Sequence, residues 1–111
     1  FVSAGLELVR GGLFYACDAL DPAHAIFQDN HSAFGSYWHG MMHRREGDFS
    51  NACYWFLKAG RIAVLEQIAG FDPIAFTMNC SKTKGNSPEL AALQQLEWNV
   101  LMAVCYAKAV E

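Results

Sequence analysis

The stretch Ser36–Gly60, SYWHGMMHRREGDFSNACYWFLKAG, decides the fold of this chain. On both sides of a short polar turn at Glu46-Gly47-Asp48, apolar residues recur at spacings of three and four, which predicts two helices. Gly47 is expected to end the first helix in a left-handed conformation. Asp48 or Ser50 is expected to cap the second helix. The stretch therefore predicts an antiparallel helical hairpin at the centre of the sequence.

The same helical spacing extends over the rest of the chain, and strand-like alternation is absent. We predict an all-α fold in which antiparallel helical hairpins form a short irregular α-solenoid or bundle, as a single domain over residues 1–111. The expected helices cover residues 3–18, 22–28, 32–46, 49–59, 73–80 and 88–110, with a short helix or turn at 61–69. Ser3, Asp21 and Ser87 are their expected N-caps. Residues 81–88 form the polar loop that we expect to be most mobile.

Composition narrows the range of partners. The 111 residues carry a net charge of −3, so the chain lacks the basic surface that nucleic-acid binding requires. No apolar run is long enough to span a membrane, and no signal peptide is visible. Apolar residues make up 53% of the chain, more than a small monomer easily buries, which favours a homodimer. Because the chain begins with Phe1, we expect it to lack an N-terminal part.

Four cysteines lie far apart in the sequence, and no pair has the CxxC spacing of a zinc or redox motif. Each falls among apolar residues of an expected helix. We therefore predict four buried free thiols in a reducing cytoplasm, with Cys53 buried and inert; the four are Cys17, Cys53, Cys80 and Cys105.

Two histidines one helical turn apart suggest a metal site. His39 and His43 lie on one face of their helix, as two imidazoles must to reach a single ion. His24 lies on a separate helix, and Glu97 is a carboxylate within an apolar stripe, where an unpaired charge is costly. Nitrogen and oxygen ligands from several helices can hold zinc, iron or manganese. The candidate metal ligands are His24, His39, His43 and Glu97, with hydrolase or oxygen chemistry as the associated activity.

Two other interpretations of these residues remain open at this point. In the first, His39 or His43 donates a hydrogen bond to Glu97 and the groups form a buried structural network without a metal. In the second, the histidines and Glu46 occupy an exposed helix face that meets solvent or a partner protein.

The arginine pair after the histidines also has two interpretations. Arg44 or Arg45 can pair with Glu46, Asp48 or the last carbonyls of the helix, and so fix the hairpin turn. Alternatively the two guanidinium groups clamp a carboxylate or phosphate ligand. The aromatic residues are expected to be core, or partly to line a pocket beside the histidines. The candidate ligand-binding set is Arg44, Arg45, Glu46 and Trp38.

A spacing typical of helical repeats runs through the central hairpin. Gly40, Ala52, Phe56 and Ala59 match the small and aromatic positions of tetratricopeptide or Sel1-like hairpins. The preceding pair of helices, over residues 3–28, matches poorly, so the sequence predicts the hairpin geometry rather than an array. The leading functional hypothesis is a helical interaction or ligand-binding module for a protein, a peptide or a small molecule. Metal binding is the alternative.

The central stretch also resembles a family of uncharacterised bacterial and fungal proteins. The resemblance rests on the run from Gly35 to Ala52, followed by Tyr54-Trp55-Phe56. Weaker likenesses are His24 with Gln28, the segment Phe71-Asp72-Pro73, and the segment from Leu93 to Trp98. The resemblance supports the helical fold, implies a longer parent chain, and brings no established reaction.

Overall fold

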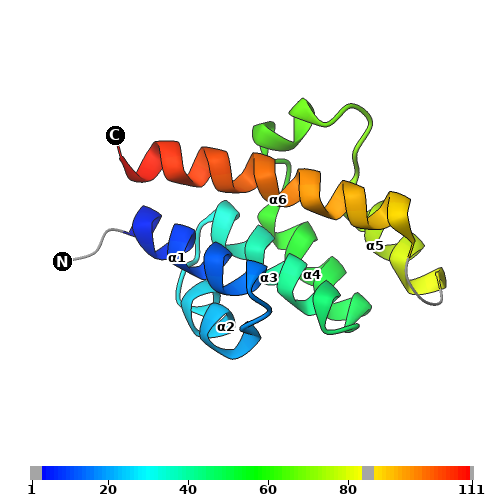
Figure 1. The fold of residues 1–111 in the computed structure, drawn as a ribbon, viewed down its shortest axis with the longest axis horizontal. Helices are drawn as coiled ribbons and strands as arrows, with labels where there is room; N and C mark the ends of the chain where they lie inside the picture. The colour runs from blue at the N-terminus through cyan, green and yellow to red at the C-terminus, as the bar shows by residue number, and fades with distance from the viewer. Residues whose placement is uncertain (1–3, 84–86, 111) are drawn as a thin grey trace.

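The computed structural model of this chain describes residues 4–83 and 87–110, except for the side chains of residues 63 and 64. The predicted all-α fold is confirmed, because every regular element in the described residues is helical. Figure 1 shows the helices in chain order. They are α1 Ala4–Ala16, α2 Leu20–Gln28, α3 Ala33–Arg45, α4 Phe49–Ala59, the short 3₁₀ helix η1 Ala63–Gln67, α5 Pro73–Lys82 and α6 Pro88–Ala109.

Side chains at the helix starts explain most of these boundaries. Ser32, Asp72 and Ser87 accept hydrogen bonds from backbone N–H groups in the first turns of α3, α5 and α6. The predicted left-handed Gly47 is confirmed, with φ of 81°. The predicted Asp21 cap is wrong, because α2 already begins at Leu20 and Asp21 lies within its first turn. The predicted cap Ser3 and residues 84–86 of the predicted mobile loop lie outside the described residues.

Short connections pair α1 with α2 and α3 with α4 as neighbouring helices, and α5 packs against α4. The long helix α6 runs across the other helices and contacts α1 and η1 (Figure 1). It is antiparallel to α1, because the start of α1 meets the end of α6 and the later part of α1 meets the middle of α6. A Cβ on Gly5 would lie 3.1 Å from the Ala109 Cα, and Trp98 Nε1 donates to the Gly12 carbonyl at 3.1 Å. The close approach of α1 and α6 depends on the small residues of α1.

Helix α3 lies at the centre of the structure. Residues 35–42 are all buried, because α1, α2 and α4 all pack against α3. The interpretation that the histidines occupy an exposed helix face is wrong for His39, because that side of α3 is covered as well. His39 is only 4% exposed. A helix enclosed on several sides shows no solvent face in its periodicity.

The two helical hairpins share one packing feature, a glycine of the first helix that faces an aromatic ring of the second. A Cβ on Gly40 would lie 2.8 Å from the Phe56 ring, and a Cβ on Gly11 would lie 2.5 Å from the Phe27 ring. Each aromatic residue follows its glycine by sixteen positions in the sequence and is almost completely buried. Ala52 is fully buried in the second hairpin, as is its counterpart Ala23 in the first. Sequence analysis found this pattern only in the second hairpin.

Several large apolar residues lie at the surface rather than in the core. Among them, Leu13 and Leu57 are 53% and 70% exposed. The prediction of four buried thiols is wrong for three of them. Only Cys105 is buried, while Cys53 and Cys80 are half-buried and Cys17 is exposed. All four are free thiols, and burial raises the pKa of Cys53, Cys80 and Cys105.

Replacing Gly40 with alanine should destabilise the fold by about 1 kcal/mol. The clash with Phe56 should cost about 1–3 kcal/mol, and the better helix propensity of alanine should recover about 1 kcal/mol of that. Urea denaturation measures the difference. In a Phe56→Leu background the clash is gone, so the same Gly40→Ala change should become neutral or stabilising. An equal loss in both backgrounds would show that the contact with Phe56 is not the cause.

Candidate functional site

Three histidines from two helices meet in one cluster. His24 of α2 and His39 and His43 of α3 each offer a ring nitrogen, and these three atoms lie within 4.8 Å of one another. The ring centres of His24 and His39 are 4.9 Å apart, and those of His39 and His43 are 4.8 Å apart. The α2–α3 packing therefore brings together three of the four residues that we predicted as metal ligands.

His39 is the buried member of this cluster. Its ring stacks on Trp55 of α4 with 3.8 Å between ring centres, and its Nδ1 is buried without a hydrogen-bond partner in the protein. Burial, together with the neighbouring His43, His24 and Lys58, lowers the pKa of His39 to about 4. The imidazole is therefore neutral at physiological pH, so one of its nitrogens carries a lone pair for a ligand.

His43 is held by side chains on both of its ring nitrogens. Its Nδ1 lies 3.2 Å from Glu46 Oε1, and its Nε2 lies 3.3 Å from the Asn51 side-chain nitrogen. A carboxylate on Nδ1 fixes the tautomer with the proton on Nδ1, which leaves Nε2 as an acceptor. Glu46 thus orients His43 and does not enter the group of three ligand atoms.

Glu97, the fourth predicted ligand, is not part of the histidine cluster. Its carboxylate is completely buried and forms an ion pair with Arg44, while Tyr37 donates its hydroxyl proton to the same carboxylate. Arg44 Nη1 also lies 3.5 Å from Thr77 Oγ1. The predicted hydrogen bond from His39 or His43 to Glu97 is therefore wrong, and the buried polar network is instead built from Glu97, Arg44 and Tyr37.

Opposite charges and aromatic rings stabilise the buried groups of this network. Burial acts to lower the pKa of Arg44, and the Glu97 carboxylate more than offsets that effect, so the pKa is raised. Burial and Glu97 also raise the pKa of Tyr37, which keeps its phenol protonated as a donor. The Arg44 guanidinium lies between the rings of Phe56 and Phe76, at 5.4 and 4.9 Å from their centres. The network joins α3 to α4, α5 and α6.

The predicted ligand-binding set of Arg44, Arg45, Glu46 and Trp38 is not brought together as one site. Arg44 is committed to Glu97. Arg45 pairs with Asp18 at 3.1 Å and covers the Tyr15 ring, so it holds the α1–α2 connection. Trp38 is fully buried in the core, stacked on Phe27. The prediction that Arg44 or Arg45 pairs with Glu46 or Asp48 is wrong, because both guanidinium groups reach partners distant in the sequence.

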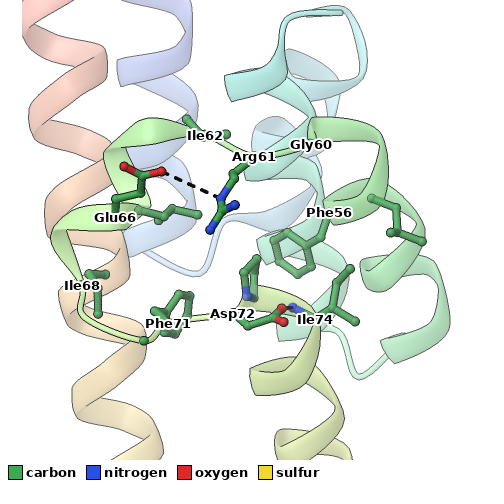
Figure 2. A pocket seen from close by; sticks show the side chains of 13 residues that line it. Phe56, Gly60, Arg61, Ile62, Glu66, Ile68, Phe71, Asp72 and Ile74 are labelled. Atoms are coloured by element: carbon green, nitrogen blue, oxygen red, sulfur yellow. Dashed lines mark hydrogen bonds and ion pairs between the residues drawn. The ribbon is translucent and has the colours of Figure 1, made fainter.

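A groove that sequence analysis missed lies between the end of α4, η1 and the start of α5 (Figure 2). Its volume is about 630 Å³. The walls are mainly apolar: Phe56, Leu57, Ile62, Leu65, Ile68, Phe71 and Ile74. The three-residue spacing of Ile62, Leu65, Ile68 and Phe71 was visible in the sequence. It indicates one apolar face but not that neighbouring helices leave a groove beside it.

Arg61 supplies the cationic group of the groove. Figure 2 shows its guanidinium among the lining side chains, on the side of Glu66. The ion pair between Arg61 and Glu66 is long, at 3.8 Å, and both side chains are largely exposed, so the pairing is weak. Asp72, the other acid of the lining, is already used as the cap of α5, where it accepts from the Ile74 and Ala75 N–H groups.

Comparison with known proteins adds no assignment to this geometry. No family model, curated protein or solved structure matches the chain. None of the helices in the described part of the chain combines the length and the hydropathy that crossing a bilayer demands. The histidine cluster, the buried network and the groove are therefore interpreted from their own chemistry.

Replacing Glu97 with glutamine should destabilise the fold by about 3–5 kcal/mol, because Arg44 would remain buried without its counter-charge. Urea denaturation of Glu97→Gln measures this loss. Glu66→Gln, at the exposed pair with Arg61, is the matched control and should change stability by less than about 0.5 kcal/mol. The double variant Arg44→Met with Glu97→Leu removes both charges and should recover most of the loss. A double variant as unstable as Glu97→Gln would contradict this account.

The fold should also become less stable as the pH is lowered, because His39 becomes protonated more readily in the unfolded chain. The ordinary histidine pKa is about 6.5, whereas that of His39 in the folded chain is about 4. Between these values the unfolded chain binds a proton that the folded chain does not, so the free energy of unfolding falls as the pH falls from about 6.5 to 4. The full loss of unfolding free energy over this pH range is about 3 kcal/mol.

Urea denaturation at several pH values, with a chelator present, measures this slope. His39→Gln should have a shallower slope between pH 6.5 and 4 than the unmodified chain. His31→Gln is the control, since His31 is exposed and lies outside the cluster. An unchanged slope in His39→Gln would show that His39 is not the group responsible.

Proposed function

We propose that this chain is an interaction module of the tetratricopeptide or Sel1-like type, which binds a short peptide segment of a partner protein. The observation that carries the proposal is the open apolar groove of about 630 Å³ between α4, η1 and α5. A pocket of this size, mainly apolar with a few polar groups, is typical of ligand sites.

The repeated hairpin packing supports the class of protein. In both hairpins a glycine of the first helix faces an aromatic ring of the second, and a fully buried alanine lies one helical turn before that ring. Helical-repeat proteins use small and aromatic residues in this way to bring two helices close together. Their usual role is to present extended surfaces to partner proteins.

The lining chemistry favours one kind of peptide. Leu57 at the groove is 70% exposed, and burying its side chain against a partner would be worth roughly 1.5–3 kcal/mol. Arg61 is only weakly paired with Glu66 and can pair with a carboxylate of the partner. The proposed ligand is therefore a peptide with a large apolar side chain next to an acidic residue.

Selection from a displayed random-peptide library tests this proposal. Enriched peptides should contain a large apolar residue beside Asp or Glu, and Leu57→Glu should weaken their binding at least 10-fold. Arg61→Glu should remove the preference for acidic neighbours. The matched control is Leu13→Glu, an exposed leucine of α1 outside the groove, which should leave binding unchanged. Failure to enrich any peptide, or equal binding to Leu57→Glu, would reject the proposal.

A further inference from the structure

The histidine cluster carries an inference that does not depend on the groove. We propose that His24, His39 and His43 bind one divalent transition-metal ion, with zinc as the best match. The three ligands come from the facing sides of α2 and α3, and a water molecule would complete the coordination.

The spacing of the ring nitrogens fits one ion. Their mutual distances are within 4.8 Å, and nitrogens that share a tetrahedral zinc at about 2.0–2.1 Å lie roughly 3.3 Å apart. Small rotations of the three side chains would bring the nitrogens to this shorter separation. His39 and His43 are one turn apart on α3, and this spacing of two histidines on one helix is common in zinc sites.

The burial and the missing hydrogen-bond partner of His39 also fit metal binding. His39 is 4% exposed, and its buried Nδ1 has no partner in the protein, although buried polar atoms are normally paired. An ordinary structural histidine would donate to a carbonyl or a carboxylate at such a position. A ligand shared with His24 and His43 explains why three imidazoles are packed together.

His43 has the surroundings of an oriented ligand. Glu46 lies 3.2 Å from its Nδ1, which is the carboxylate–histidine arrangement that positions metal ligands in proteins. Coordination through Nε2 requires the Asn51 amide, now 3.3 Å away, to turn aside. The carboxylate of Glu46 also offsets the repulsion between the ion and Lys58, whose ammonium lies 4.8 Å from the centre of the Trp55 ring.

The donor set selects the class of metal. Three imidazole nitrogens suit zinc, copper, nickel or cobalt, whereas calcium and magnesium require oxygen ligands. The cysteines take no part in the cluster, and Glu97 is held by Arg44 and Tyr37. Three protein ligands with an open position are characteristic of zinc sites that bind a water molecule.

Titration of the metal-free chain with Zn²⁺ and with Co²⁺ tests the proposal. The chain is produced without a histidine tag, and chelated metal is removed by dialysis. Calorimetry should give one Zn²⁺ per chain, and Co²⁺ should give the visible absorption bands of a four- or five-coordinate ion. His24→Ala and His43→Ala should each weaken Zn²⁺ binding at least about 100-fold. Glu46→Gln should weaken it about 10- to 100-fold while all three ligands remain.

His31→Ala is the matched control, because His31 is an exposed histidine of the same chain outside the cluster. It should leave stoichiometry and affinity unchanged. His39 also stacks on Trp55, so the test relies on the two half-buried histidines, and a circular-dichroism spectrum checks that each variant is folded. The proposal is overturned if Zn²⁺ does not bind, if His24→Ala and His43→Ala bind it as tightly as the unmodified chain, or if His31→Ala is equally weakened.

Discussion

The ion pair between Arg44 and Glu97 is the constraint on which the placement of α6 depends. The two residues lie 53 positions apart and are both almost completely buried. Moving α6 along its axis by one turn would carry the carboxylate about 5.4 Å from the guanidinium and leave two buried charges without partners. Apolar packing alone does not impose this register, because α6 carries large apolar residues on its solvent side as well, among them Leu96 and Tyr106. Trp98, which donates to the Gly12 carbonyl, fixes the same register against α1.

Helix α3 separates two polar sites of different character. On one side its Arg44 and Tyr37 meet Glu97 through an ion pair and a hydroxyl hydrogen bond, and in that network Arg44 Nε is buried without a partner. On the other side its His39 and His43 meet His24, and the buried Nδ1 of His39 has no protein partner. The first site has the composition of a structural element and the second has the composition of a ligand site. The difference follows from the groups that α6 and α2 bring to α3.

Local signals in the sequence were sufficient for the helices but not for their contacts. Ser32, Asp72 and Ser87 cap their own helices, and Gly47 turns the chain at α3, so neighbouring residues determine these boundaries. The partner of Glu97 depends on which face of α3 is covered by α6, and periodicity does not contain that information. Sequence analysis missed the shared packing of the first hairpin because Asn30 stands where the second hairpin has Ala59. Asn30 instead accepts hydrogen bonds from Ser32 and forms the tight connection into α3.

A single turn of α4 connects all three regions of interest. Trp55 stacks on His39, Phe56 packs against Gly40 and the Arg44 guanidinium, and Leu57 extends into the groove. Consecutive residues on a helix point about 100° apart, so one turn can contact three surroundings at once. Phe56 cannot move away from Gly40 without opening the ring contact that covers the buried charge. The buried Arg44–Glu97 ion pair therefore fixes the position of α4 through Phe56. That position in turn determines how Trp55 covers His39 and where Leu57 lies in the groove.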